Sequence, residues 1–190
     1  MRRLLRATLS AIFVVACAAA GSAQDRPFLT TSPTPEGSAW WLRTEYHPFG
    51  ADVRGIPAGR IHAGWCKVNE LRRELFPADL ASYFGDEQSP FAVDGFFDGS
   101  KTRHTAFVGV YETCKGARGA FLLIAAWPKG KPPVIRHLVD LPGEREFAVV
   151  YSPDGSTITL QHCLECDNIS QYRWDKSMRR FVLLPLKDEQ

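Results

Sequence analysis

The sequence predicts a mainly β protein, α+β at most, in which short strands follow one another as an antiparallel meander. Eight short segments of the C-terminal half are each rich in β-branched or aromatic residues, and each is bounded by a turn signal. Only one segment has helical spacing. Strands and helices do not alternate, so a parallel doubly wound sheet is not expected.

Residues 1–23 have the three parts of a secretory signal peptide. A basic head containing Arg2 and Arg3 precedes an apolar run, and small residues end the segment at Ala23. The apolar run is shorter than the roughly 20 residues of a membrane span, so no transmembrane helix is expected. We therefore expect a periplasmic or secreted protein. Alternatively, Cys17, in a segment that loosely resembles a lipoprotein processing site, carries a lipid anchor.

Removal of the signal peptide changes the charge balance. The full chain has 23 Lys and Arg against 21 Asp and Glu. Three arginines lie in residues 1–23, so 20 basic residues remain against 21 acidic ones, and the net charge falls from +2 to −1. No global positive field is left to attract nucleic acid, and a nucleic-acid partner is not expected.

The mature chain divides into a leader and one domain. Residues 24–37 are rich in Thr, Ser and Pro, which is typical of a flexible leader. Residues 38–190 have the length of a single β-rich domain. Its first strand is expected at 38–46. One short helix is expected near 69–76, where Asn69 is a suitable N-cap and three apolar residues have helical spacing: Val68, Leu71 and Leu75.

From residue 91 onward the pattern is that of strands. They are expected at 91–97, 105–111, 120–127, 134–141, 147–151, 157–162, 172–174 and 181–184. Segment 120–127 is apolar throughout, which predicts a central strand buried on both faces. Segment 157–161 alternates apolar and polar residues, which predicts one face in contact with water.

Four cysteines remain after export, and a local pair lies at Cys163 and Cys166. An oxidising compartment favours structural disulfides, and four cysteines allow three pairings. A Cys163–Cys166 bond would pin a turn between two strands, and a Cys66–Cys114 bond would tie the expected helical region to the sheet. Two alternatives stay open. A zinc site would need all four cysteines or a histidine, and a redox pair would need a helix N-terminus to lower a thiol pKa.

No catalytic, cofactor-binding or metal-binding residue is predicted. The five histidines lack metal-binding spacing, and no phosphate-binding glycine loop or nucleophile elbow occurs. Two acid pairs could serve a hydrolase, Asp94 with Asp98 and Glu144 with Glu146, but each lies at an expected turn. The five tryptophans could form a carbohydrate platform, but a role in the β core is preferred: Trp40, Trp41, Trp65, Trp127 and Trp174.

Residues 91–110 contain Gly95, Asp98 and Gly99, followed by an apolar strand. This arrangement resembles a degraded FG-GAP or VCBS-type repeat, whose acidic loop binds calcium and whose copies build propeller-like sheets. Residues 151–160 are similar to the strand–turn–strand of blades in TolB-like extracytoplasmic proteins. The resemblance implies a propeller-like sheet.

The loop departs from the repeat where its acidic ligands should be. Phe96, Ser100 and His104 occupy those positions. A vestigial calcium loop at Asp94 and Asp98 would have too few carboxylates, because calcium prefers six to eight oxygen ligands. No cofactor is therefore expected.

These observations favour an exported, non-catalytic β domain that binds a protein or another component of the cell envelope. Some periplasmic inhibitors of cell-wall hydrolases and some immunity proteins resemble this scaffold, so an inhibitor or immunity-type role is expected. The alternative is an envelope enzyme, either a thiol oxidoreductase using Cys163 and Cys166 or a hydrolase using loop acids.

Overall fold

The computed structural model describes residues 27–32, 44–81, 84, 91–143, 148–163 and 168–185. Strands dominate these residues, and all paired strands are antiparallel. The mainly β prediction is therefore confirmed. None of the helices in the described part is long and apolar enough to cross a membrane.

The large sheet is built around two long neighbouring strands, β7 (His104–Thr113) and β8 (Arg118–Ala126). On one side of them lies β9 (Val134–Pro142). On the other side, β5 (Trp65–Glu70) and β6 (Ala92–Gly95) pair with different halves of β7. Gly116, between β7 and β8, has φ of 85°, which favours glycine at this tight turn.

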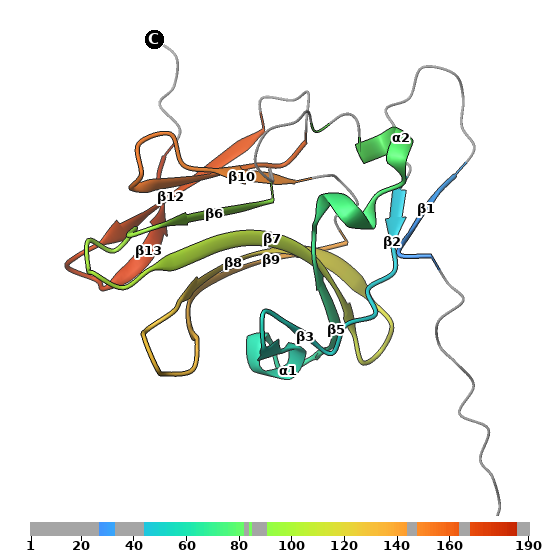
Figure 1. The fold of residues 1–190 in the computed structure, drawn as a ribbon, viewed down its shortest axis with the longest axis horizontal. Helices are drawn as coiled ribbons and strands as arrows, with labels where there is room; N and C mark the ends of the chain where they lie inside the picture. Colours follow the sequence, from blue (N-terminus) through green and yellow to red (C-terminus); the bar gives the residue numbers. More distant parts are fainter. Residues whose placement is uncertain are drawn as a thin grey trace, which may run out of the picture.

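The small sheet contains the last four strands in sequence order. They are β10 (Val149–Tyr151), β11 (Thr157–Gln161), β12 (Ile169–Asp175) and β13 (Arg180–Leu183). Figure 1 shows the small sheet on one side of the large sheet, and β3 and α1 on the other.

Short elements lie before and after β5 in the chain. A hairpin of β3 (Asp52–Val53) and β4 (Ile56–Pro57) leads into α1 (Ala58–Ile61). A 3₁₀ turn (Arg73–Leu75) and α2 (Ala78–Ala81) follow β5.

The core has two halves, separated by the large sheet. Alternate residues of β8 enter each half, because successive side chains of a strand point to opposite faces. Leu122 and Ile124 pack toward the small sheet, and Phe121 and Leu123 pack toward the β3–β4 hairpin and α1. The prediction that this strand is central and buried on both faces is confirmed.

The expected helix near 69–76 is wrong over its first half. Val68 and Asn69 belong to strand β5, which pairs with β7, and only the 3₁₀ turn and α2 follow. Val68 is buried in the half of the core beside α1, whereas Leu71 is buried in the other half. Two residues three apart face opposite ways in an extended chain, so their spacing does not mark one face of a helix.

Two further expectations need correction. Leu29–Thr31, within the expected leader, forms β1 and pairs with β2 (Thr44–Tyr46), and this places the side chain of Leu29 in the core. The polar face of β11 is not in contact with water, because Thr157 and Thr159 are buried. The Thr157 hydroxyl donates a hydrogen bond to Asp154 at 2.8 Å, so this hydroxyl has a hydrogen-bond partner although it is buried.

Candidate functional site

The described cysteines form disulfides, as expected. Cys66 and Cys114 are bonded to each other, and Cys163 is disulfide-bonded as well. Cys166 and Cys17 lie outside the described residues. The Cys66–Cys114 bond joins β5 to the residue after β7, so it ties two neighbouring strands together and does not tie a helix to the sheet.

The two acids of the expected loop are held on opposite sides of the large sheet. Asp94 accepts hydrogen bonds from Thr105 and Arg103. Asp98 lies 3.3 Å from His104 and 3.0 Å from Arg136. The ring of His104 faces Phe181 of the small sheet, so the two carboxylates do not converge. Across the described ranges, no cluster of three His, Cys, Asp or Glu side chains could hold a metal ion.

Asp94 lies instead in an open cavity of about 310 Å³, which we call the Trp127 hollow. Five residues line it: Arg54, Asp94, Arg103, Thr105 and Trp127. They come from the β3–β4 turn, from β6, and from the beginning of β7 and the end of β8. The hollow therefore lies on the face of the large sheet that carries α1, beside the hairpin.

Strand pairing places the polar groups of the hollow side by side. Asp94 is directly opposite Thr105 in the β6–β7 register. The backbone N–H of Trp127 donates to the carbonyl of Arg103 at 2.8 Å, which holds the two flanking residues together beyond the ends of β7 and β8. Paired residues share one face of a sheet, so these side chains all border the same space.

A chain of hydrogen bonds fixes these side chains. The indole N–H of Trp127 donates to the Thr105 hydroxyl at 3.0 Å, and this hydroxyl donates to Asp94 at 2.5 Å. Arg103 donates to the other oxygen of Asp94 at 2.5 Å. Partial burial opposes ionisation of Asp94, but the hydrogen bonds from Thr105 and Arg103 and the nearby positive charges lower its pKa. Asp94 is thus a fixed carboxylate at neutral pH.

Arg54 forms the wall opposite the strands. Its guanidinium donates twice to the buried Glu70, from Nε at 2.8 Å and from Nη2 at 2.5 Å. It also lies 5.1 Å from the ring centre of Phe107. The hydrogen bonds to Glu70 raise the pKa of Arg54, so the group stays charged.

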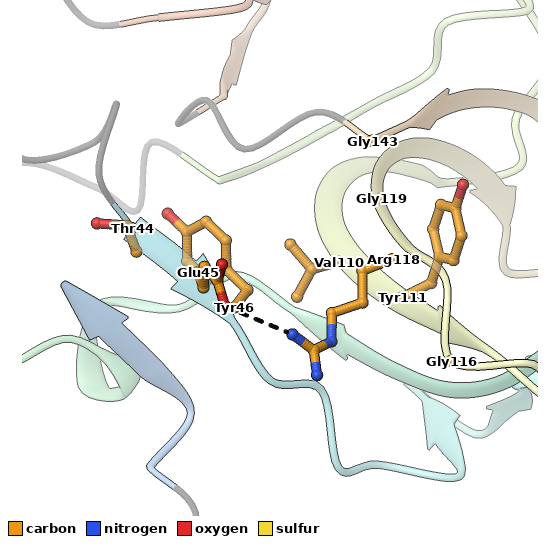
Figure 2. Close-up of a pocket in the computed structure, with 9 residues that line it drawn as sticks. All are labelled: Thr44, Glu45, Tyr46, Val110, Tyr111, Gly116, Arg118, Gly119 and Gly143. Carbon is orange, nitrogen blue, oxygen red and sulfur yellow. Dashed lines mark ion pairs between the residues drawn. The ribbon is translucent and has the colours of Figure 1, made fainter. Parts of the chain in front are cut away.

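A second cavity, of about 230 Å³, lies between β2 and the turn from β7 to β8. Figure 2 shows Glu45 and Arg118 facing each other across it at 3.8 Å, with the side chain of Tyr111 projecting away from this ion pair. The buried Tyr46 hydroxyl has no hydrogen-bond partner among the residues that the structure describes, and burial raises its pKa. Thr44 and Gly143 adjoin segments outside the described residues, whereas all the residues that line the Trp127 hollow have described neighbours.

The described tryptophans lie in the core or pack against it, as predicted, and Trp127 and Trp174 do so while partly buried. Trp65 is buried and stacks on Tyr111 with ring centres 3.9 Å apart, as the core prediction requires. Trp127 lines the hollow, and Trp174 lies beside Arg136, whose guanidinium carbon is 5.4 Å from its ring centre. Trp40, Trp41, Glu144 and Glu146 lie outside the described residues.

Sequence reasoning missed most of the hollow. The sequence predicts no functional role for Arg54 or Arg103, and it predicts only a core role for Trp127, which packs against the core and also lines the hollow. One signal was present for Arg54: an Arg-Gly pair between Val53 and Ile56 has the pattern of a two-residue hairpin turn.

Comparison of the chain with protein-family models, with curated proteins and with solved structures gives no significant match. The resemblance to calcium-binding and propeller-blade repeats therefore stays a prediction, and the argument for function depends on the geometry of the hollow.

Proposed function

We propose that the protein is an exported, non-catalytic β domain that binds another component of the cell envelope through the Trp127 hollow. Inhibitors of envelope enzymes and immunity-type proteins are domains of this kind. The observation that carries the proposal is the hydrogen-bonded set of Trp127, Thr105, Asp94 and Arg103 in an open cavity. Fixed polar groups beside an aromatic ring are typical of binding sites.

The ionisation of the hollow favours binding over catalysis. A general acid or base works best when its pKa lies near the working pH. The pKa of Asp94 is lowered and that of Arg54 is raised, so both pKa values are shifted further from neutral pH. These groups are suited to holding a partner in place, and poorly suited to exchanging protons with a substrate.

The disulfides and the N-terminal sequence support export. Cys66 and Cys114 are crosslinked, and Cys163 is oxidised as well, which is typical of proteins in oxidising compartments. The signal-peptide pattern in residues 1–23 supports export by a cleaved secretory signal. The oxidoreductase alternative has less support, because Cys163 is 7% exposed and lacks the accessibility of a reactive thiol.

The proposal is tested by native extraction of the full chain, affinity-tagged at its C-terminus, from the envelope of its own host. We expect a co-purifying envelope component, which is lost when Arg103→Glu reverses the charge beside Asp94. Arg173→Glu is the matched control, because Arg173 is exposed on β12 of the small sheet. A protein that emerges alone, or a partner that persists in the Arg103→Glu variant, would contradict the proposal.

The same preparation tests the location. Mass spectrometry of the purified protein should give an N-terminus at Gln24, or an acylated Cys17 if the lipoprotein alternative applies. An unprocessed Met1 in the envelope fraction would count against export by a cleaved signal.

A further inference from the structure

We propose that the Trp127 hollow binds a neutral sugar ring of an envelope glycan. This inference rests on the proposed function, since it names the chemistry of the group that the hollow contacts. Three features of the hollow carry it: its balance of charge, its arrangement of donors and acceptors, and the fixed indole.

Each arginine that lines the hollow is paired with a carboxylate, although Glu70, the partner of Arg54, also accepts a hydrogen bond from the mostly exposed Arg72. Arg54 is paired with Glu70 at 2.5 Å, and Arg103 is paired with Asp94 at 2.5 Å. A charged ligand would have to compete with one of these ion pairs for its partner. A neutral ligand leaves both pairs intact, so the hollow favours an uncharged polar molecule over an anion or a cation.

Hydrogen-bonding capacity remains after these pairs have formed. A guanidinium has five N–H donors, and Arg103 uses one of them on Asp94. Each oxygen of Asp94 accepts one hydrogen bond in the hollow and keeps a second lone pair. Donors and acceptors therefore lie side by side. Adjacent hydroxyl groups of a sugar ring match this arrangement, because each hydroxyl both donates and accepts.

The indole supplies the apolar surface that a sugar ring also needs. Trp127 is half-buried, and its N–H is bonded to Thr105, which fixes the orientation of the ring. A sugar presents C–H groups on the faces of its ring, and these can pack on an aromatic surface without losing hydroxyl hydrogen bonds. Arg103 has 64% of its side chain exposed, so the hollow opens to solvent and a longer glycan can continue beyond it.

The test is titration of the full mature protein with neutral oligosaccharides of glucose, galactose, mannose and N-acetylglucosamine, with oligogalacturonate as the anionic comparator. We expect saturable binding to at least one neutral oligosaccharide. Trp127→Ala removes the apolar surface, and Asp94→Asn changes the acceptor without changing its size. Asp94→Asn should weaken binding by about tenfold or more, the effect of losing a hydrogen bond to a charged group. Trp127→Ala should weaken binding by about tenfold, because the sugar ring loses the aromatic surface on which it packs. Arg173→Glu should bind like the unaltered protein.

Three results would overturn the inference: no saturable binding to any neutral oligosaccharide, tighter binding to oligogalacturonate, or full affinity in the Asp94→Asn and Trp127→Ala variants when both are folded. The extraction experiment separates this failure from that of the proposed function. If a protein partner depends on Arg103 and no sugar binds, the sugar inference is refuted and the proposed binding function is retained. If no partner of any kind is found, both the sugar inference and the proposed binding function are refuted.

Discussion

Arg54 adopts a backbone conformation that arginine rarely adopts. Its φ is 52°, and it is followed by Gly55 with φ of 75°. Such two-residue hairpin turns favour Asn-Gly, and a non-glycine residue in this region costs about 1 kcal/mol. The two hydrogen bonds from Arg54 to Glu70 offset that cost. The side-chain hydrogen bonds of Arg54 thus stabilise a turn whose positive φ is unfavourable for arginine, and they place the guanidinium at the wall of the hollow.

Loss of the Glu70 carboxylate should therefore destabilise the protein. Its side chain is 4% exposed and accepts hydrogen bonds from Arg54 and Arg72. We expect Glu70→Ala to lower the free energy of unfolding by about 3 kcal/mol, because Arg54 would lose its partner in a partly buried site. Arg72→Ala should cost about 0.5 kcal/mol or less, since Arg72 is mostly exposed. Equal effects of the two variants in urea unfolding would refute this account of Glu70.

The buried His104 and the half-buried His137 should make stability depend on pH. His104 faces Asp98 and Arg136, and His137 packs against Tyr172 with ring centres 5.2 Å apart. Burial lowers the pKa of each histidine, and for His104 this outweighs the opposing charge of Asp98. The unfolded chain then binds more protons than the native state below the ordinary histidine pKa of about 6.5. Stability is present above that pH and is lost as the pH falls through the window below it.

The measurement is urea unfolding at about pH 7.5 and about pH 5, a range in which histidine is the main titrating side chain. We expect a lower urea midpoint at the lower pH. In the His137→Leu variant, the difference between the midpoints at the two pH values should be smaller. His62→Gln changes an exposed histidine and should leave the difference unaltered. Equal midpoints at the two pH values would show that burial does not perturb these rings.

At the scale of the elements, β5 illustrates how pairing overrides local pattern. Asn69 and Leu71 fit a helix start by sequence, but β7 supplies the backbone partners for residues 65–70. At Gly109 the two strands approach so closely that an added Cβ would lie 2.5 Å from the carbonyl oxygen of Asn69 and would overlap the ring of Phe121. Glycine at this position therefore permits the pairing.

Gly109→Ala should accordingly destabilise the large sheet. We expect a loss of about 2 to 3 kcal/mol, which is typical of overpacking a filled interior. Gly59→Ala is the matched control, because a Cβ on Gly59, in α1, would meet no atom within 4 Å. That variant should be neutral or slightly stabilising. Thermal unfolding of both variants makes the comparison, and a Gly109→Ala protein as stable as the Gly59→Ala protein would contradict the close approach.

The sequence allowed every strand after residue 91 to be predicted, because each has a β-rich segment and a turn signal. Strands β3 and β4 could not be predicted, since two residues do not establish a period of two. Strand β1 was missed because it lies in a segment rich in Thr, Ser and Pro, a composition typical of a leader. The hollow was not predictable for a related reason. Asp94, Thr105 and Trp127 become neighbours only through the β6–β7 and β7–β8 registers. A predicted meander indicates that consecutive strands pair, but it does not specify the register in which they pair.

At the scale of the whole molecule, the large sheet separates two core halves and the Cys66–Cys114 disulfide closes one end of it. The two cysteines are 48 residues apart in the sequence, and the segment between them includes β6 and all of β7. Crosslinking restricts the unfolded chain, so the bond should stabilise both halves together.

We expect the double variant Cys66→Ser, Cys114→Ser to lose about 3 to 4 kcal/mol of unfolding free energy, as the chain-entropy model gives for a loop of this length. Guanidinium unfolding of the oxidised protein and of the variant measures the difference. The unaltered protein should also lack reactive thiols at Cys66 and Cys114 until it is unfolded and reduced. A variant as stable as the oxidised protein would mean that strand pairing alone fixes this end of the sheet.

The central claim, that the hollow contacts an envelope partner, is tested most directly by photo-cross-linking in the native host. A benzophenone side chain placed at the exposed Lys101 should yield a specific adduct after illumination, because Lys101 is two residues from Arg103 and its replacement leaves every residue that lines the hollow unchanged. The same group at position 173 on the small sheet should yield none. Adducts at both positions in equal amount, or at neither, would contradict the account.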